Sequence, residues 1–126
     1  MGTVAAILFC VLMVALAIFQ LALIAGVPIG QLAWGGQDRV LPARKRVGSV
    51  TSIVLYALFS IVVLQRAGLV AIIPIQGIVD IGIWVLVAYF ALGIVMNALS
   101  RSKPERWTMA PLSLLLAILA LVVSLS

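Results

Sequence analysis

The sequence predicts an all-α integral membrane protein in which four transmembrane helices form two antiparallel hairpins. Hydrophobic residues make up 66% of the 126 residues and charged residues only 9%, and the mean hydropathy is +1.38. A soluble domain this small buries only about 60–70% of its unfolded surface, so much of this apolar surface must face lipid. Four long apolar runs, with seven of the eight cations in alternate connections, complete the pattern.

The four runs predict four helices within one domain that spans residues 1–126. A bilayer core about 30 Å thick is crossed by about 20 apolar residues in a helix. No segment alternates with a period of two, as the strands of a membrane barrel do, and a helix satisfies its own backbone hydrogen bonds in lipid. The predicted spans are Thr3–Ala25, Val47–Gln65, Gly77–Met96 and Trp107–Leu125.

The cations predict the orientation in the cell (plasma) membrane, which would be the inner membrane of a two-membrane cell. The first and third connections carry seven of them, and the second carries only Arg66. The positive-inside rule therefore places the first and third connections in the cytoplasm and both termini outside. The start, MGTVAAILFC, has no Lys or Arg, so we expect a first membrane helix and not a cleaved signal.

Several residues are typical of helix ends. Pro42 suits the start of the second helix, and Gly68 suits its end, with Arg66 in the last turn. Ser102 and Glu105 have the spacing of a capping box, which places the start of the fourth helix near Lys103. Pro111 would kink that helix.

Two irregular segments flank these helices. In GVPIGQLAWGG (26–36), Pro28 kinks or ends the first helix, and Trp34 suits the membrane interface. Ala22, Gly26 and Gly30 have the small-residue spacing that lets helices pack closely. The segment 69–79, LVAIIPIQGIV, is too apolar for a free loop and too short to span. We expect it to form a short element at the outer surface or against the mouth of the bundle.

Five residues are candidates for binding a solute or an ion. Asp80 is the only acid within a predicted span, and such residues often mark ion or proton paths; the alternative is an interfacial pair with Arg66. A polar stripe on the second helix includes Ser52 and Tyr56, and a matching stripe on the third includes Tyr89 and Asn97. These stripes predict a polar seam between the two helices, separate from Asp80, with ordinary helix packing as the alternative.

Other polar residues have simpler explanations. Arg44, Lys45 and Arg46 are candidates for lipid headgroups, although a cluster of three serves mainly as a topology signal. Gln20, the only amide in the first helix, favours a hydrogen bond between helices over a ligand contact.

The composition argues against catalysis and against soluble partners. There is no His and only one Cys, Cys10, so we expect no metal site and no cofactor. We find no paired carboxylates and no nucleophile beside a base, and therefore expect no enzyme activity. The net charge of +5 is explained by topology, so we expect membrane lipid as a partner and no nucleic acid.

The segments AWGG (33–36) and NALSRSKPERWTMAP (97–111) resemble those of a loose set of small, uncharacterised prokaryotic membrane proteins with four spans. The resemblance covers most of the chain and implies fold and localisation only. Small multidrug resistance transporters have a Glu in their first helix, and this chain has no acid there. Fluoride channels carry polar and Phe motifs that are missing here.

Two functions remain open at this point. The first is transport of a small or amphipathic solute. Packed helices fill their own centre, so transport would require a homo-oligomer or a cavity opened by the segment 69–77. The second is a non-catalytic accessory or scaffold role, in which the chain binds lipid or a larger complex within the bilayer.

Overall fold

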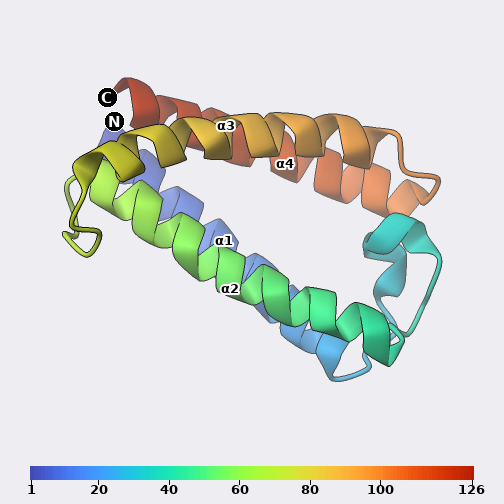
Figure 1. Ribbon diagram of the computed structural model, residues 1–126. Helices are drawn as coiled ribbons and strands as arrows, with labels where there is room; N and C mark the ends of the chain where they lie inside the picture. The colour runs from blue at the N-terminus through green and yellow to red at the C-terminus, as the bar shows by residue number, and fades with distance from the viewer.

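The computed structural model describes all 126 residues and contains four long helices and no strands (Figure 1). They are α1 (Gly2–Ile24), α2 (Ala43–Arg66), α3 (Gln76–Ala98) and α4 (Lys103–Leu125). Two short 3₁₀ turns, η1 (Gly30–Leu32) and η2 (Trp34–Gly36), lie between α1 and α2. All four helices are long and apolar enough to cross a membrane. The predicted all-α class with four spans is confirmed.

The helices form two antiparallel hairpins arranged as a V. Helix α1 packs along α2, α3 packs along α4, and the hairpins meet mainly through α1 and α4. Figure 1 shows them close together where both termini lie and apart at the other end. We call the first the terminal end. The second is the basic end, because the segments 25–46 and 99–106 there carry every cation except Arg66.

The packed core lies mainly toward the terminal end and reaches the middle of the helices. Its largest members include Phe9 and Met13 of α1 and Phe90 of α3, and the rings of Phe9 and Phe90 meet edge to face at 5.7 Å. Ala5 and Ala6 of α1 and Ala117 and Ala120 of α4 belong to the same cluster. Because lipid is as apolar as Leu, small residues that allow close helix contact contribute much of the association in a membrane. They explain why the hairpins converge here.

Most predicted helix ends are found in the structure. Pro42 is the N-cap of α2, and Gly68 follows its C-cap with φ +81°. Ser102 is the N-cap of α4, and its Oγ accepts a hydrogen bond from the Glu105 N–H at 3.5 Å. The Glu105 carboxylate accepts from Ser100 Oγ and not from the Ser102 backbone, so only half of the capping box forms. Pro111 lies inside an uninterrupted α4.

The predicted packing stripe Ala22–Gly26–Gly30 is not a helix face. Helix α1 ends at Ile24, and Gly26 takes φ +89° just beyond its C-cap. The Gly26 N–H donates to Leu23 O and the Val27 N–H donates to Ala22 O, which closes the helix in a Schellman arrangement. Gly26 therefore terminates the helix, since a left-handed residue cannot continue it, and the close-packing role belongs to alanines at the terminal end.

The apolar segment 69–75 lies at the terminal end without regular structure. The buried amide of Gln65 secures it: Gln65 Nε2 donates to Ile73 O at 2.7 Å, and Oε1 accepts from the N–H groups of Ile72 and Ile73. These bonds satisfy backbone groups that no helix pairs. No residue of the segment lines the cavity described below, so this segment does not form that cavity.

Candidate functional site

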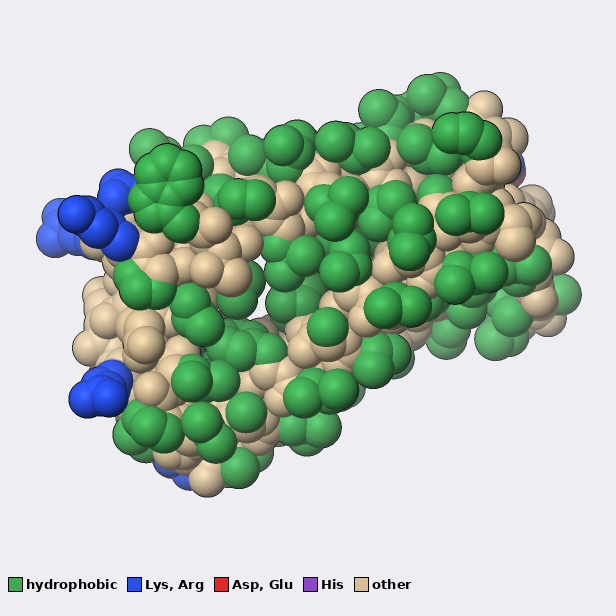
Figure 2. Space-filling view, turned by 180° about the vertical axis from the view of Figure 1, so that it is seen from behind, with side chains coloured by type: hydrophobic (Ala, Val, Ile, Leu, Met, Phe, Trp, Pro, Cys, Tyr) green, Lys and Arg blue, Asp and Glu red, His purple; other side chains and the backbone are tan.

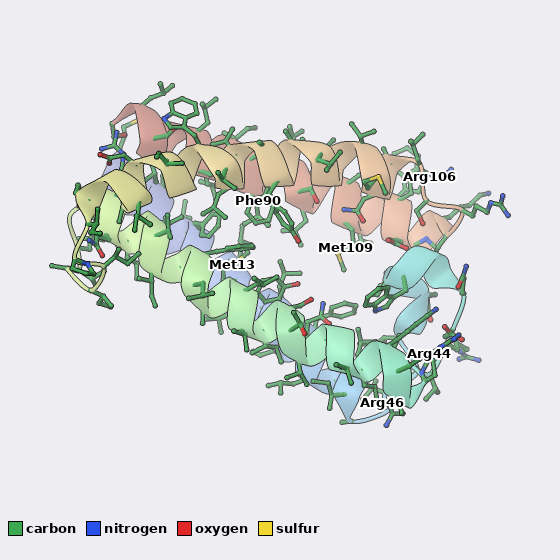
Figure 3. The ribbon with its side chains drawn as sticks, in the orientation of Figure 1. Met13, Arg44, Arg46, Phe90, Arg106 and Met109 are labelled. Carbon is green, nitrogen blue, oxygen red and sulfur yellow. The ribbon has the colours of Figure 1, made fainter.

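A cavity of about 350 Å³ lies between the two hairpins, in the half of the molecule toward the basic end. All four helices and the 3₁₀ turns contribute to its wall. The space-filling view shows the molecule hollowed between the hairpins (Figure 2). In Figure 3, Met109 points from α4 into this space. We expected four helices to fill their own centre, and the divergence of the hairpins overturns that expectation.

A strap closes the basic end of the cavity. We use this name for residues 29–36, which contain η1 and η2 and bridge the mouths of the two hairpins (Figure 1). The Trp34 ring lies against Gly48 of α2 and lines the cavity. On the other side, Ser102 Oγ at the start of α4 donates to the Gln31 carbonyl. The strap thus joins one hairpin to the other.

The strap is tightly folded. The Gly30 N–H donates to Arg39 O at 2.7 Å, so the chain folds back on itself directly after α1. Trp34 has φ +53°, a left-handed conformation that costs a non-glycine residue about 1–2 kcal/mol. Strain of this kind persists only where surrounding contacts impose it, and here the Gly48 surface and the Ser102 bond supply those contacts.

One wall of the cavity carries polar groups from the first hairpin. Gln20 Nε2 donates to the Tyr56 hydroxyl at 3.2 Å, so the predicted interhelical hydrogen bond of Gln20 is present. Gln20 Oε1 is buried and has no partner. Ser52 Oγ donates to the Gly48 carbonyl one turn earlier in α2. This wall therefore brings the polar side chains of Gln20, Ser52 and Tyr56 to the cavity.

The opposite wall carries polar groups from the second hairpin. Asn97 Nδ2 donates to Gly93 O at 2.8 Å and to Ser113 Oγ at 3.0 Å. Tyr89 lies beside the Phe59 ring at 5.3 Å. The predicted residues Ser52, Tyr56, Tyr89 and Asn97 all line this one cavity. They do not form a closed seam between α2 and α3, because the hairpins diverge and Asn97 pairs within its own hairpin.

Asp80 lies away from the cavity, near the start of α3 and the terminal end. Its Oδ1 is 3.8 Å from Arg66 Nε and accepts a hydrogen bond from Gln76 Nε2 at 3.2 Å. Its side chain is 52% exposed. Asp80 thus pairs with Arg66 and lies outside the candidate site.

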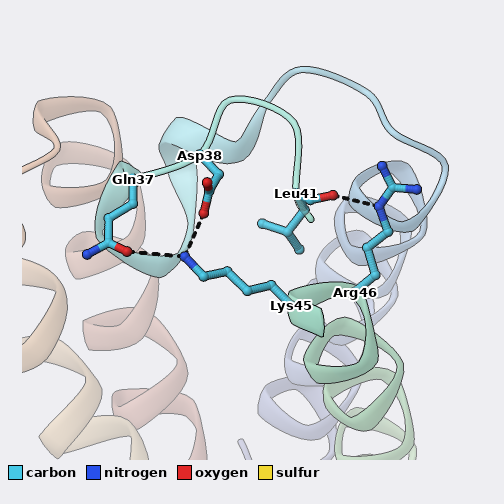
Figure 4. Close-up of polar contacts among 5 residues, drawn as sticks. All are labelled: Gln37, Asp38, Leu41, Lys45 and Arg46. Carbon is cyan, nitrogen blue, oxygen red and sulfur yellow. Dashed lines mark hydrogen bonds and ion pairs between the residues drawn. The ribbon is translucent and has the colours of Figure 1, made fainter. Parts of the chain in front are cut away.

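The predicted lipid-headgroup cluster is partly used within the first connection (Figure 4). Lys45 Nζ lies 2.6 Å from Asp38 Oδ2 and also donates to Gln37, while Arg46 Nε donates to Leu41 O at 2.7 Å. Only Arg44 makes no side-chain bond. Arg106 likewise makes no side-chain hydrogen bond and no ion pair, and it borders a groove described below.

Glu105, Trp34 and Ser113 are among the residues of the cavity wall that the sequence does not predict as site residues. Glu105 was recognised only as a helix-cap residue, Trp34 only as an interfacial residue, and Ser113 was not singled out. All three line the cavity. A polar residue within an apolar helix was a usable signal for Ser113. No sequence signal places Trp34 there, since the fold of the strap decides it.

The chain matches no family model, no curated protein and no solved structure in the three comparisons.

Proposed function

We propose that this chain is a small multi-pass protein of the cell membrane that binds a small amphipathic solute in the cavity and carries it across the bilayer. One observation supports this most directly: a cavity of about 350 Å³, with apolar and hydrogen-bonding walls, lies between helices of membrane-spanning length. Pockets of about 300–1,000 Å³ with a few polar groups are typical of small-molecule sites. A single chain supplies the whole wall, so the site itself needs no homo-oligomer.

The proposed transport uses the strap as its gate. The hairpins are packed at the terminal end, where the core cluster lies, and the strap bridges them at the basic end. Release of the Ser102 bond to Gln31 would free the strap from α4 and open the cavity at that end. We further propose that the basic end faces the cytoplasm, because it carries seven of the eight cations. Cysteine labels at positions 44 and 103 should then react from the same, cytoplasmic, face.

A flux experiment with paired variants of α2 tests the proposal. Ser52 lines the cavity, whereas its neighbour Thr51 is exposed, and each hydroxyl donates to the carbonyl four residues earlier. The protein would be reconstituted in vesicles loaded with radiolabelled phenyltrimethylammonium, benzamide or benzenesulfonate. Each probe has one apolar ring and one polar group of different charge.

We expect at least one probe to leave protein vesicles faster than protein-free vesicles. Ser52→Trp should fill the cavity and reduce that flux at least about tenfold, and Thr51→Trp, which points to lipid, should leave it nearly unchanged. Equal flux with and without protein for all three probes, or equal effects of the two variants, would refute transport through this cavity.

A lipid-binding accessory role is the second candidate, and one groove favours it. This groove of about 360 Å³ lies between α3 and α4 on a face of the second hairpin. Ile94, Ala98, Pro111 and Leu114 form apolar walls, and Arg106 stands at the edge of the groove. Arg106 makes no ion pair within the chain, so its guanidinium charge is free to attract the phosphate of an anionic lipid.

Native mass spectrometry tests the second candidate. Phosphatidylglycerol should remain bound more than phosphatidylcholine, and Arg106→Gln should remove that preference while Arg44→Gln leaves most of it. Equal retention of both lipids would refute it. A larger complex that survives mild detergent, without probe flux, would support an accessory role over transport.

A further inference from the structure

The charge of the cavity wall differs from that of the surface around it. Seven cations surround the basic end, yet no Lys or Arg lines the cavity. Figure 2 shows Lys and Arg side chains projecting outward at this end. Only one charged side chain reaches the wall, and it is the acid Glu105. The cavity therefore presents negative charge within a basic region.

Glu105 is buried and has no cationic partner. The residue is only 8% exposed, and the two ion pairs in the protein are Lys45–Asp38 and Arg66–Asp80. Its hydrogen-bond donor is the Ser100 hydroxyl, at 3.0 Å from Oε2. A carboxylate has about four acceptor positions, so most of its capacity is unused. It lies in the first turn of α4, near the positive end of the helix dipole.

The neighbouring cations face away from the cavity. Arg101 and Lys103 are exposed, and Arg106 borders the groove on a different face of α4. The helix geometry explains this, since residues 105 and 106 point about 100° apart. Glu105 therefore lies at the cavity wall, whereas the neighbouring cations do not.

The rest of the wall complements a positive ligand. Phe19, Trp34, Tyr56, Tyr89 and Phe90 line the cavity, and aromatic faces attract cations within about 6 Å. A divalent metal ion fits poorly, because it needs about six oxygen ligands and no group of three or more acidic, His or Cys side chains exists.

We propose that the cavity selects monovalent organic cations, such as an ammonium group carried on a small apolar body, with Glu105 as the charge-recognising residue. The ammonium would lie against Glu105 at the basic end, and the apolar body would extend between the aromatic side chains. This inference rests on the proposed solute-binding function and names the substrate class of the same cavity.

Binding of the three probes to the purified protein in detergent tests this class. Phenyltrimethylammonium should bind more tightly than benzamide, and benzenesulfonate should bind most weakly. Glu105→Gln should weaken the binding of phenyltrimethylammonium about tenfold to a hundredfold, as expected for loss of one charge at partly screened distances. The affinity for benzamide should be nearly unchanged. Gln is also a favoured N3 residue beside a Ser N-cap, so this variant keeps the helix start.

Asp80→Asn is the matched control, because it removes an acid at the other end of the molecule and should change neither affinity. If Glu105 had only a structural role, Glu105→Gln would weaken the binding of phenyltrimethylammonium and of benzamide equally. That result would overturn the proposal. If benzamide or benzenesulfonate binds tightly and phenyltrimethylammonium does not, the substrate class is refuted, although the cavity remains a binding site. Binding of no probe would remove the proposed function as well.

Discussion

Gly30→Ala should destabilise the strap, because no side chain fits at this position. A Cβ built on Gly30 would lie 1.8 Å from Asp38 O and 2.7 Å from Arg39 O. Both neighbours are backbone atoms, so no flexible side chain can move aside. The same segment carries the 2.7 Å hydrogen bond from the Gly30 N–H to Arg39 O, which the displacement would break.

The expected loss follows from these two contacts. Forcing an extra carbon into packed structure costs about 1–3 kcal/mol, and losing the hydrogen bond adds about 1 kcal/mol. The total is about 2–4 kcal/mol of unfolding free energy. Since the strap closes the cavity, probe binding should weaken together with stability.

Unfolding in mixed micelles, titrated with sodium dodecyl sulfate and followed by circular dichroism, measures this loss. Gly77→Ala is the control: a Cβ there has no heavy atom within 4 Å, and the residue lies in the first turn of α3. Alanine is the better helix former, so this variant should be neutral or stabilised by up to about 1 kcal/mol. Equal stability of the two variants would refute the tight folding of the strap.

Three further variants test the packing and the polar contacts in the same assay. Phe9→Ala should lower the free energy of unfolding by about 2–3 kcal/mol, chiefly through the cavity it leaves. Leu8→Ala, at a residue 48% exposed, should lower it little. Similar losses for the two variants would contradict the packed core at the terminal end. Tyr56→Phe should cost about 0.5–1.5 kcal/mol by removing the hydroxyl that accepts from Gln20, and a double-mutant cycle with Gln20→Leu should show coupling. Asp80→Asn should cost less than about 1 kcal/mol, because its ion pair is partly exposed, and a larger loss would contradict the geometry of that pair.

Sequence reasoning located four of the polar cavity residues but not their partners. Ser52 and Tyr56 share one helix face, as do Tyr89 and Asn97, and their spacing alone shows this. Spacing does not reveal that Asn97 pairs with Ser113 in α4 or that Tyr56 pairs with Gln20 in α1. Those choices depend on which helices are neighbours and on how far they diverge.

The sequence by itself determined the four helices and the grouping of cations, because helix length, backbone hydrogen bonding in lipid and loop charge are local properties of the chain. It also determined most helix ends, through Pro42, Gly68 and Ser102. Only the tertiary structure decided that the hairpins converge on small alanines and separate toward the basic end. The fold of the strap and the direction of Glu105 follow from that separation, since both depend on the space that opens between segments far apart in the chain.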